Sequence, residues 1–258
     1  MVGNGTVCAL RVGEWDWAAA LLDEWIPAEA SSDLFAEFFV DRAILRSLRG
    51  QDVDADGDIE EAARLRTTMT DPQFESYELL ARAWWSLTTG DLAGARSHAE
   101  RAPSITGYFQ PLALPLAARA TLWAGDPTDA AAALAALEAT EHWGPVLDVD
   151  RLVARAGVAA LSGRGPEALA AYREALRGYR ALGLAFDEAV AVVDMATVLP
   201  APEREAPDVT AAIDAARETL TRLGAAPFLA RLELAASKAP APAPGQPAGD
   251  RQVVPSAG

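Results

Sequence analysis

The chain has 258 residues, of which 51% are hydrophobic and 23% are charged, and its formal net charge is −15. This length suffices for one large domain or two small ones, and the composition is that of a packed globular protein. The negative charge argues against general electrostatic binding of DNA, RNA or an anionic membrane surface. It favours a partner with basic residues, or a basic neighbouring domain.

The single cysteine, Cys8, excludes an internal disulfide framework and fits a reducing compartment. We expect Cys8 to pack as a small residue in a helix. The sequence has no run of roughly 18 apolar residues that could form a membrane-spanning helix. Its start, "MVGNGTVCALRVGEW", lacks the basic and apolar regions of a signal peptide. We therefore expect a soluble, cytoplasmic protein.

Alanine and leucine dominate the hydrophobic share, which favours helix over sheet, and a repeat runs through the chain. In each unit a glycine is followed by a small residue after five positions and by apolar or small residues after nine and twelve. The matches are Gly13 with Ala18, Leu22 and Trp25; Gly90 with Ala95, Ala99 and Ala102; Gly125 with Ala130, Leu134 and Leu137; and Gly163 with Ala168, Tyr172 and Ala175.

This spacing predicts pairs of antiparallel helices. Glycine ends the first helix of a pair in a left-handed conformation, and the second helix then presents one apolar face. With Gly50 included, the glycines recur every 35 to 40 residues, close to the roughly 34-residue tetratricopeptide period. The sequence therefore predicts an all-α fold, a right-handed α-solenoid of tetratricopeptide-like (TPR-like) helix pairs.

First helices of the pairs are expected at 33–49, 73–89, 108–124, 147–162 and 184–198. Asp71 is the expected N-cap of the second of these, with Pro72 in its first turn. After an interruption, "LPAPEREAP", helices are expected near 208–223 and 227–237. The first unit is expected to be truncated, since about a dozen residues precede Gly13. We assign the repeat domain to 1–238 and expect the Pro/Ala/Gly-rich segment 239–258 to be disordered.

Three stretches carry a resemblance to known proteins: "LRVGEWDWAAALLDEW", "ALSGRGPEALAAYREALRGYRALG" and "TAAIDAARETLTRLGAAPFLARLELAA". They resemble helical-repeat regions of large actinobacterial regulators, namely class III adenylate or guanylate cyclases with an ATPase module and ATP-binding LuxR-type activators. The resemblance covers most of 1–238 and implies a C-terminal sensor or scaffold region. No "GxxxxGK[ST]" phosphate loop and no helix-turn-helix segment after residue 236 is found, which favours the cyclase-like arrangement or a free-standing repeat protein.

No catalytic constellation emerges from the sequence, so we expect neither an enzyme nor a bound cofactor. His98 and His142 lie on different repeats without a cysteine or a paired carboxylate at ligand spacing, and we expect structural roles for both. Serines are isolated, and none lies in a "GxSxG" motif.

The stretch "RGQDVDADGDIEEAARL" allows two interpretations. Asp52, Asp54 and Asp56 followed by Gly57 match the start of a calcium loop, with Glu60 as a further ligand. The twelfth position of such a loop, however, is Ala63 instead of glutamate. Counted from Gly50, residues Ala55, Ile59 and Ala62 keep the repeat register, so the same residues fit a helix start with Asp52 as N-cap and a Glu60–Arg64 pair. We expect an extended turn with the helix beginning near Asp58, and no metal site.

Most of the seven tryptophans are expected in the core between repeats. Trp84 and Trp85 point in directions about 100° apart, so both can hardly share one core face. We therefore take Trp85 as the candidate partner-binding residue on the concave face. The expected function is a protein-interaction scaffold, or the sensor arm of a bacterial signalling or transcription-regulatory protein, that docks a protein, a peptide or a neighbouring domain. The alternative is a regulatory module that binds a small molecule in the solenoid cavity.

Overall fold

The computed structural model describes residues 2–27, 29–66 and 71–237, and every regular element in these ranges is helical. One series of helices comprises α1 (Val2–Val12), α3 (Ala36–Arg49), α5 (Pro72–Thr89), α7 (Gln110–Ala124), α9 (Pro145–Leu161) and α11 (Ala185–Val198). Their partners are α2 (Trp15–Trp25), α4 (Asp52–Leu65), α6 (Leu92–Ile105), α8 (Pro127–Glu138), α10 (Gly165–Leu182) and α13 (Pro207–Leu223). The remaining elements are α12 (Ala201–Arg204), α14 (Ala226–Ser237) and the 3-10 turns η1 (Asp33–Phe35) and η3 (Gly107–Phe109).

The helix pairs follow the sequence pattern closely. The five expected first helices agree with the structure to within two residues when the 3-10 turns are included. Asp71 is the N-cap of α5, where its side chain accepts a hydrogen bond from the Gln73 backbone at 2.9 Å. The two expected C-terminal helices correspond to α13 and α14, and the interruption before them contains the short α12.

All five repeat glycines have a positive φ, as expected: Gly13, Gly50, Gly90, Gly125 and Gly163. At Gly50 the reason is explicit, because φ is 76° and the Gly50 and Gln51 backbone N–H groups both return to carbonyl groups of the last turn of α3. Any other residue would strain this backbone conformation.

The repeat positions form the core between helices. The small residues five positions after the glycines are fully buried, namely Ala18, Ala55, Ala95, Ala130 and Ala168. At the later positions, Leu134 is half-buried and Trp25 is 50% exposed. The expectation for Trp25 is therefore wrong: it is the last residue of α2, and the chain turns away at Ile26.

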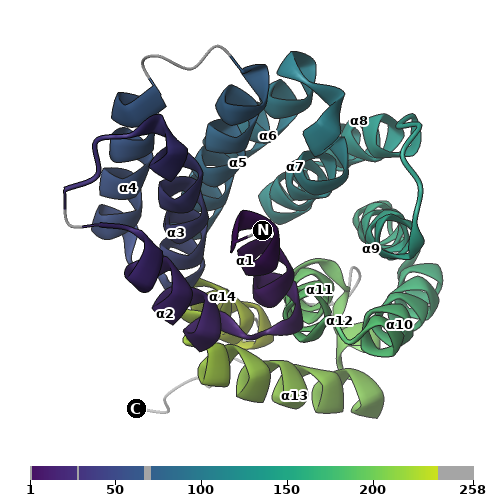
Figure 1. The fold of residues 1–258 in the computed structure, drawn as a ribbon. Helices are drawn as coiled ribbons and strands as arrows, with labels where there is room; N and C mark the ends of the chain where they lie inside the picture. The colour runs from purple at the N-terminus through teal and green to yellow at the C-terminus, as the bar shows by residue number, and fades with distance from the viewer. Residues whose placement is uncertain (1, 28, 67–70, 238–258) are drawn as a thin grey trace, which may run out of the picture.

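The first and the last described helices, α1 and α14, both pack against α3 and α11. In Figure 1, α1 lies within the circle formed by the other helices of its series, and it packs against α2, α3 and α11. Helix α14 packs against α3, α5 and α11, so the last described helix contacts the second and third helix pairs. The space enclosed by the helix pairs is thus partly filled by α1 and bordered by α14.

Aromatic side chains hold these distant segments together. Phe186 of α11 contacts Trp15 with ring centroids 4.9 Å apart and Phe228 of α14 at 5.4 Å. Phe228 also meets Trp84 of α5 and Trp123 of α7, at 6.3 and 6.0 Å. Aromatic pairs at such distances stabilise a fold by about 0.5–1.5 kcal/mol beyond the area they bury.

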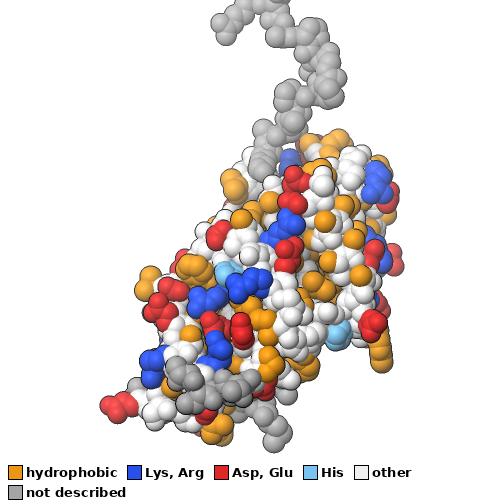
Figure 2. Space-filling view, turned by 90° about the horizontal axis from the view of Figure 1, so that it is seen from above, with side chains coloured by type: hydrophobic (Ala, Val, Ile, Leu, Met, Phe, Trp, Pro, Cys, Tyr) orange, Lys and Arg blue, Asp and Glu red, His pale blue; other side chains and the backbone are white. Residues whose placement is uncertain are grey.

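The surface is mixed in character. On the face in Figure 2, acidic and basic side chains lie close together, with hydrophobic side chains scattered between them. None of the helices in the described part of the chain is long and apolar enough to cross a membrane.

Candidate binding site

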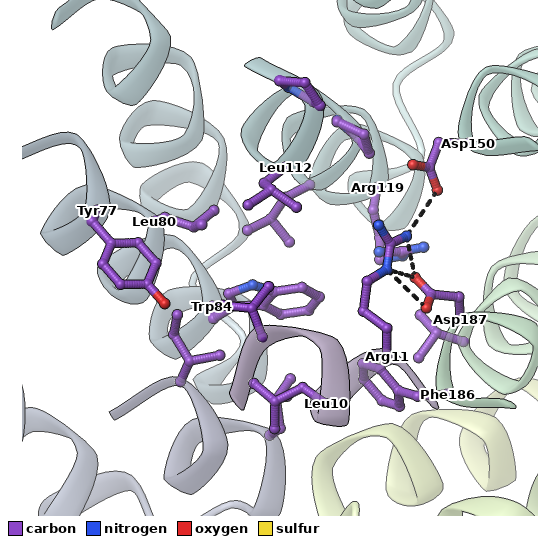
Figure 3. Close-up of a pocket in the computed structure, with 17 residues that line it drawn as sticks. Leu10, Arg11, Tyr77, Leu80, Trp84, Leu112, Arg119, Asp150, Phe186 and Asp187 are labelled. Carbon is purple, nitrogen blue, oxygen red and sulfur yellow. Dashed lines mark hydrogen bonds and ion pairs between the residues drawn. The ribbon is translucent and has the colours of Figure 1, made fainter. Parts of the chain in front are cut away.

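A central cavity of about 80 Å³ lies beside α1. Its walls come from α1, α3, α5, α7, α9 and α11, and Figure 3 shows the side chains that line it. One part of the wall is apolar, formed in α5 and α7 by Leu80, Trp84, Leu112 and Leu116, with Phe186 opposite. A cavity needs roughly 10–15 Å³ to hold one water, so this space can take a small molecule.

The opposite part of the wall is charged. Arg11 of α1 donates from Nε and Nη2 to the carboxylate of Asp187 in α11, with the shortest distance 2.7 Å. The same Nη2 lies 3.7 Å from Oδ1 of Asp150 in α9. Burial lowers the pKa of Arg11, but the Asp187 and Asp150 charges more than offset it, so the guanidinium stays charged.

Arg119 of α7 is the second guanidinium at this end of the cavity. Its Nε donates to both carboxylate oxygens of the fully buried Asp194, at 3.1 and 3.0 Å. The Trp123 indole donates to the same carboxylate at 2.7 Å. Burial raises the pKa of Asp194, against the opposing charge of Arg119. Arg119 thus lines the cavity and at the same time forms a buried ion pair with Asp194.

Asp150 of α9 interacts electrostatically with both arginines. Tyr179 of α10 donates a hydrogen bond to its Oδ1 at 2.5 Å, and the side chain is 7% exposed. Burial raises the pKa of Asp150 to about 6, although the Arg11 charge opposes the shift. A second cavity of about 10 Å³ adjoins this point and shares Pro115, Arg119 and Asp150 with the first.

At the other end, Asp41 of α3 anchors α1. It is fully buried and accepts hydrogen bonds from Thr6 of α1, at 2.7 Å, and from Tyr77 of α5. Burial raises the pKa of Asp41 to about 7, against the opposing effect of these two hydrogen bonds. The polar contacts of α1 within the molecule therefore reach α3 at one end and α11 at the other.

The acidic stretch of the second repeat is placed differently from our expectation. Helix α4 begins at Asp52 and runs through Gly57, so the expected extended turn before Asp58 is wrong, and the residue at the N-cap is Gln51. Asp52, Asp54, Asp56 and Glu60 therefore lie along one continuous helix. Among the described residues, no group of three or more metal-ligating side chains is arranged to hold an ion.

The neighbouring Asp58 holds α4 against the preceding helix. It is buried and accepts hydrogen bonds from Arg42 at 2.8 Å and from Arg46 at 2.7 Å, which fixes α4 against α3. Arg64 pairs with Glu61 at position i−3 in place of the expected Glu60.

The tryptophans divide between core and surface. Trp85 is half-buried, and its indole donates to the backbone carbonyl of Asp52 at 3.0 Å, so it fastens α5 to the start of α4. Its neighbour Trp84 is the one that lines the central cavity. The expectation that most tryptophans are core residues holds for Trp15 and Trp123, whereas Trp17, Trp25 and Trp143 are half or more exposed.

The remaining candidates stay outside the cavity. Cys8 is exposed on α1, so the expected packing role is wrong. His142 has Nδ1 3.1 Å from the Thr140 hydroxyl in the α8–α9 connection, and His98 is half-buried on α6.

Two charged residues at this end of the cavity could have been noticed in the sequence. Arg119 and Asp194 interrupt the apolar segments "LPLAARATLW" and "AVAVVDMATV". A charged residue in such a segment is buried only when it is paired. The pairing itself joins residues 75 positions apart, and no local pattern could identify it.

No protein-family model matches the chain, and no curated protein sequence matches it significantly.

Proposed function

We propose that the chain is a right-handed α-solenoid of TPR-like helix pairs that acts as a regulatory module, sensing a small molecule in its central cavity. The regular helix pairs and the left-handed glycines support the repeat assignment. The cavity supports the sensing role, because binding sites for small molecules are typically concave and mostly apolar with a few polar groups.

The single observation that carries the proposal is that helices far apart in the sequence together line the cavity. The walls combine α1 with α11, and these two helices are joined by the Arg11–Asp187 pair. A ligand in the cavity contacts both, so binding stabilises the contact between α1 and α11 by mass action. In the regulators that the sequence resembles, such a change would be passed to a neighbouring domain.

A screen of small metabolites by thermal shift tests this proposal. We expect at least one compound to raise the melting temperature of the protein and to lose this effect in Leu112→Trp, which fills the cavity from α7. Leu234→Trp is the matched control, because Leu234 is 62% exposed on α14 and lies outside the cavity. Compounds that stabilise the protein and Leu112→Trp equally would contradict the proposal.

Partner docking is the second candidate. The interior face expected to receive a partner is covered in part by α1, so docking there requires α1 to move. Helix α2 offers an alternative: Trp17 and Trp25 are exposed on this helix, and the nearby carboxylates of Asp16 and Asp23 are 94% and 70% exposed. Aromatic and acidic groups together suit a peptide rich in lysine or arginine.

Fluorescence anisotropy with a labelled oligoarginine peptide tests this second candidate. We expect binding at low salt that weakens as salt is added, and a loss of affinity in the double variant Trp17→Ala/Trp25→Ala. Trp143→Ala is the control, because Trp143 is 90% exposed in the distant α8–α9 connection. Equal affinity of both variants for the peptide would exclude α2 as the docking surface.

A further inference from the structure

The chemical class of the ligand can be inferred from the polar groups at the charged end of the cavity. This inference rests on the proposed sensing function, since it concerns the same cavity. Three features carry it: the balance of charge, the hydrogen-bonding capacity that the protein leaves unused, and the apolar wall opposite.

The balance of charge disfavours a charged ligand. Two guanidinium groups, Arg11 and Arg119, lie beside three carboxyl groups, Asp150, Asp187 and Asp194. An ammonium ligand here would lie beside both arginines, and a carboxylate ligand would add to the acidic groups. Removing either ion from water also carries a large desolvation penalty.

The unused hydrogen-bonding capacity includes both donors and an acceptor. Arg119 directs its Nε to Asp194, and within the described part of the chain its Nη1 and Nη2 donate to no protein acceptor. Asp150 accepts from Tyr179 through Oδ1, and no donor among the described residues reaches its Oδ2. Both side chains line the cavity and both are nearly buried, with 11% and 7% exposure.

A hydroxyl group matches this arrangement. It accepts a hydrogen bond from a guanidinium N–H and donates its own hydrogen to a carboxylate oxygen. A carbonyl group can only accept, and a hydrocarbon satisfies neither protein group, so both bind less favourably than a hydroxyl. Opposite this end, Trp84, Leu80 and Leu112 offer an apolar surface for the rest of the ligand (Figure 3).

We propose that the cavity binds a compact, uncharged and mainly apolar molecule whose hydroxyl group lies between Arg119 and Asp150. Its apolar part contacts the side chains of α5 and α7. The hydroxyl accepts from Arg119 and donates to Oδ2 of Asp150.

Four probes of similar size test the ligand class: benzyl alcohol, toluene, benzoate and benzylammonium. Isothermal titration calorimetry of the full chain at neutral pH gives their affinities. We expect benzyl alcohol to bind at least about tenfold more tightly than each of the other three, and Leu112→Trp to abolish its binding.

Asp150→Asn is the second variant, and it preserves the size of the side chain and an acceptor for Tyr179. It removes one negative charge, so we expect the affinity for benzoate to rise at least about tenfold relative to the affinity for benzyl alcohol. Glu138→Gln is the control. Glu138 pairs with Arg155 at the surface, and its substitution should leave the ratio of the benzoate and benzyl alcohol affinities unchanged. Circular dichroism and melting temperature verify that both variants are folded.

The outcomes separate the two proposals. If toluene, benzoate or benzylammonium binds as tightly as benzyl alcohol and Leu112→Trp abolishes that binding, the cavity is a binding site and the inferred ligand class is wrong. If Asp150→Asn leaves the ratio of the benzoate and benzyl alcohol affinities unchanged, the assigned position of the hydroxyl is wrong. If none of the probes binds, or if Leu112→Trp binds them as the unmodified chain does, both the ligand class and the cavity as a binding site are overturned.

Discussion

The guanidinium of Arg11 donates hydrogen bonds to the carboxylate of Asp187, a residue 176 positions later in the chain. This pair fastens the first helix to the eleventh and forms one wall of the central cavity. Substitution of Arg11 by methionine retains much of the apolar stem and leaves Asp187 without its cation. Because the pair is partly buried, we expect a loss of about 1–3 kcal/mol in the free energy of unfolding, measured in urea.

Arg155→Met is the control for this prediction. Arg155 pairs with Glu138 across the surface, where both side chains are well exposed, 52% and 40%. Such pairs contribute about 0–1 kcal/mol. Equal losses in the two variants would show that the Arg11–Asp187 contact does not stabilise the packing of α1 against α11.

Gly50 and Gly125 provide a matched pair for the packing of α14. Both have a left-handed backbone, with φ values of 76° and 80°. A methyl group at Gly50 would lie 3.2 Å from Pro227 of α14, whereas at Gly125 it would meet nothing within 4 Å. Alanine should therefore cost about 1–2 kcal/mol at Gly125 through backbone strain alone. At Gly50 we expect a further loss of about 1 kcal/mol. Urea unfolding of the two variants measures both values, and equal losses would argue against the α14 contact.

Two glycines inside helices should respond to alanine in opposite directions. At Gly57 of α4 an added methyl group would meet nothing within 4 Å, so Gly57→Ala should stabilise the protein by about 0.5–1 kcal/mol. At Gly157 of α9 the methyl group would lie 2.5 Å from the Leu122 side chain of α7. We expect Gly157→Ala to destabilise the protein by about 1–3 kcal/mol, measured by thermal or urea unfolding.

The Gly57 variant also tests the calcium hypothesis. A calcium loop needs glycine for its sharp turn, so alanine would then destabilise the calcium-bound protein. Because Gly57 lies within a helix in the structure, we expect Gly57→Ala to stabilise the protein and millimolar calcium to leave the melting temperature of both forms unchanged. A calcium-dependent rise that Gly57→Ala removes would restore Asp52, Asp54, Asp56 and Glu60 as ligands.

Asp41 should make the protein less stable as the pH rises. Burial raises its pKa to about 7 from an unfolded value of 3.8, so the folded state binds the proton more tightly than the unfolded state. The resulting stabilisation is complete below about pH 4 and is lost as the pH rises through about 7. Asp41→Asn mimics the neutral carboxyl group.

Urea unfolding at pH 5 and pH 8 measures this effect. Between pH 5 and pH 8 we expect the free energy of unfolding of the unmodified protein to fall by about 1–3 kcal/mol more than that of Asp41→Asn. Asp150, whose pKa burial raises to about 6, contributes a loss in the same direction that both proteins share. Identical pH profiles for the two proteins would show that Asp41 does not titrate in this range.

Much of the secondary structure could be predicted from the sequence, because its causes are local. Glycine ends a helix where the backbone is left-handed, Asp71 caps the helix that Pro72 begins, and Ala95 or Ala168 recurs where a facing helix comes close. These signals act within one helix pair. The same local pattern misplaced the start of α4, whose first residue, Asp52, accepts a hydrogen bond from Trp85 of α5.

The candidate site could not be predicted in this way. The sequence presents Trp84 and Trp85 as equivalent neighbours, and only the packing of α5 against α4 and around the cavity distinguishes them. Arg119 and Asp194 are recognisable as charges in apolar helices, but their pairing depends on where α7 and α11 come to lie.

The sequence by itself determined the helices, their pairing and the residues between adjacent helices. Only the tertiary structure decided that α1 lies inside the molecule, that α14 returns to α3 and α5, and that Arg11 meets Asp187. The physical reason is that such contacts join helices far apart in the sequence, which local signals do not bring together. Their positions depend on how all the intervening helices pack against one another, and no single helix pair contains that information.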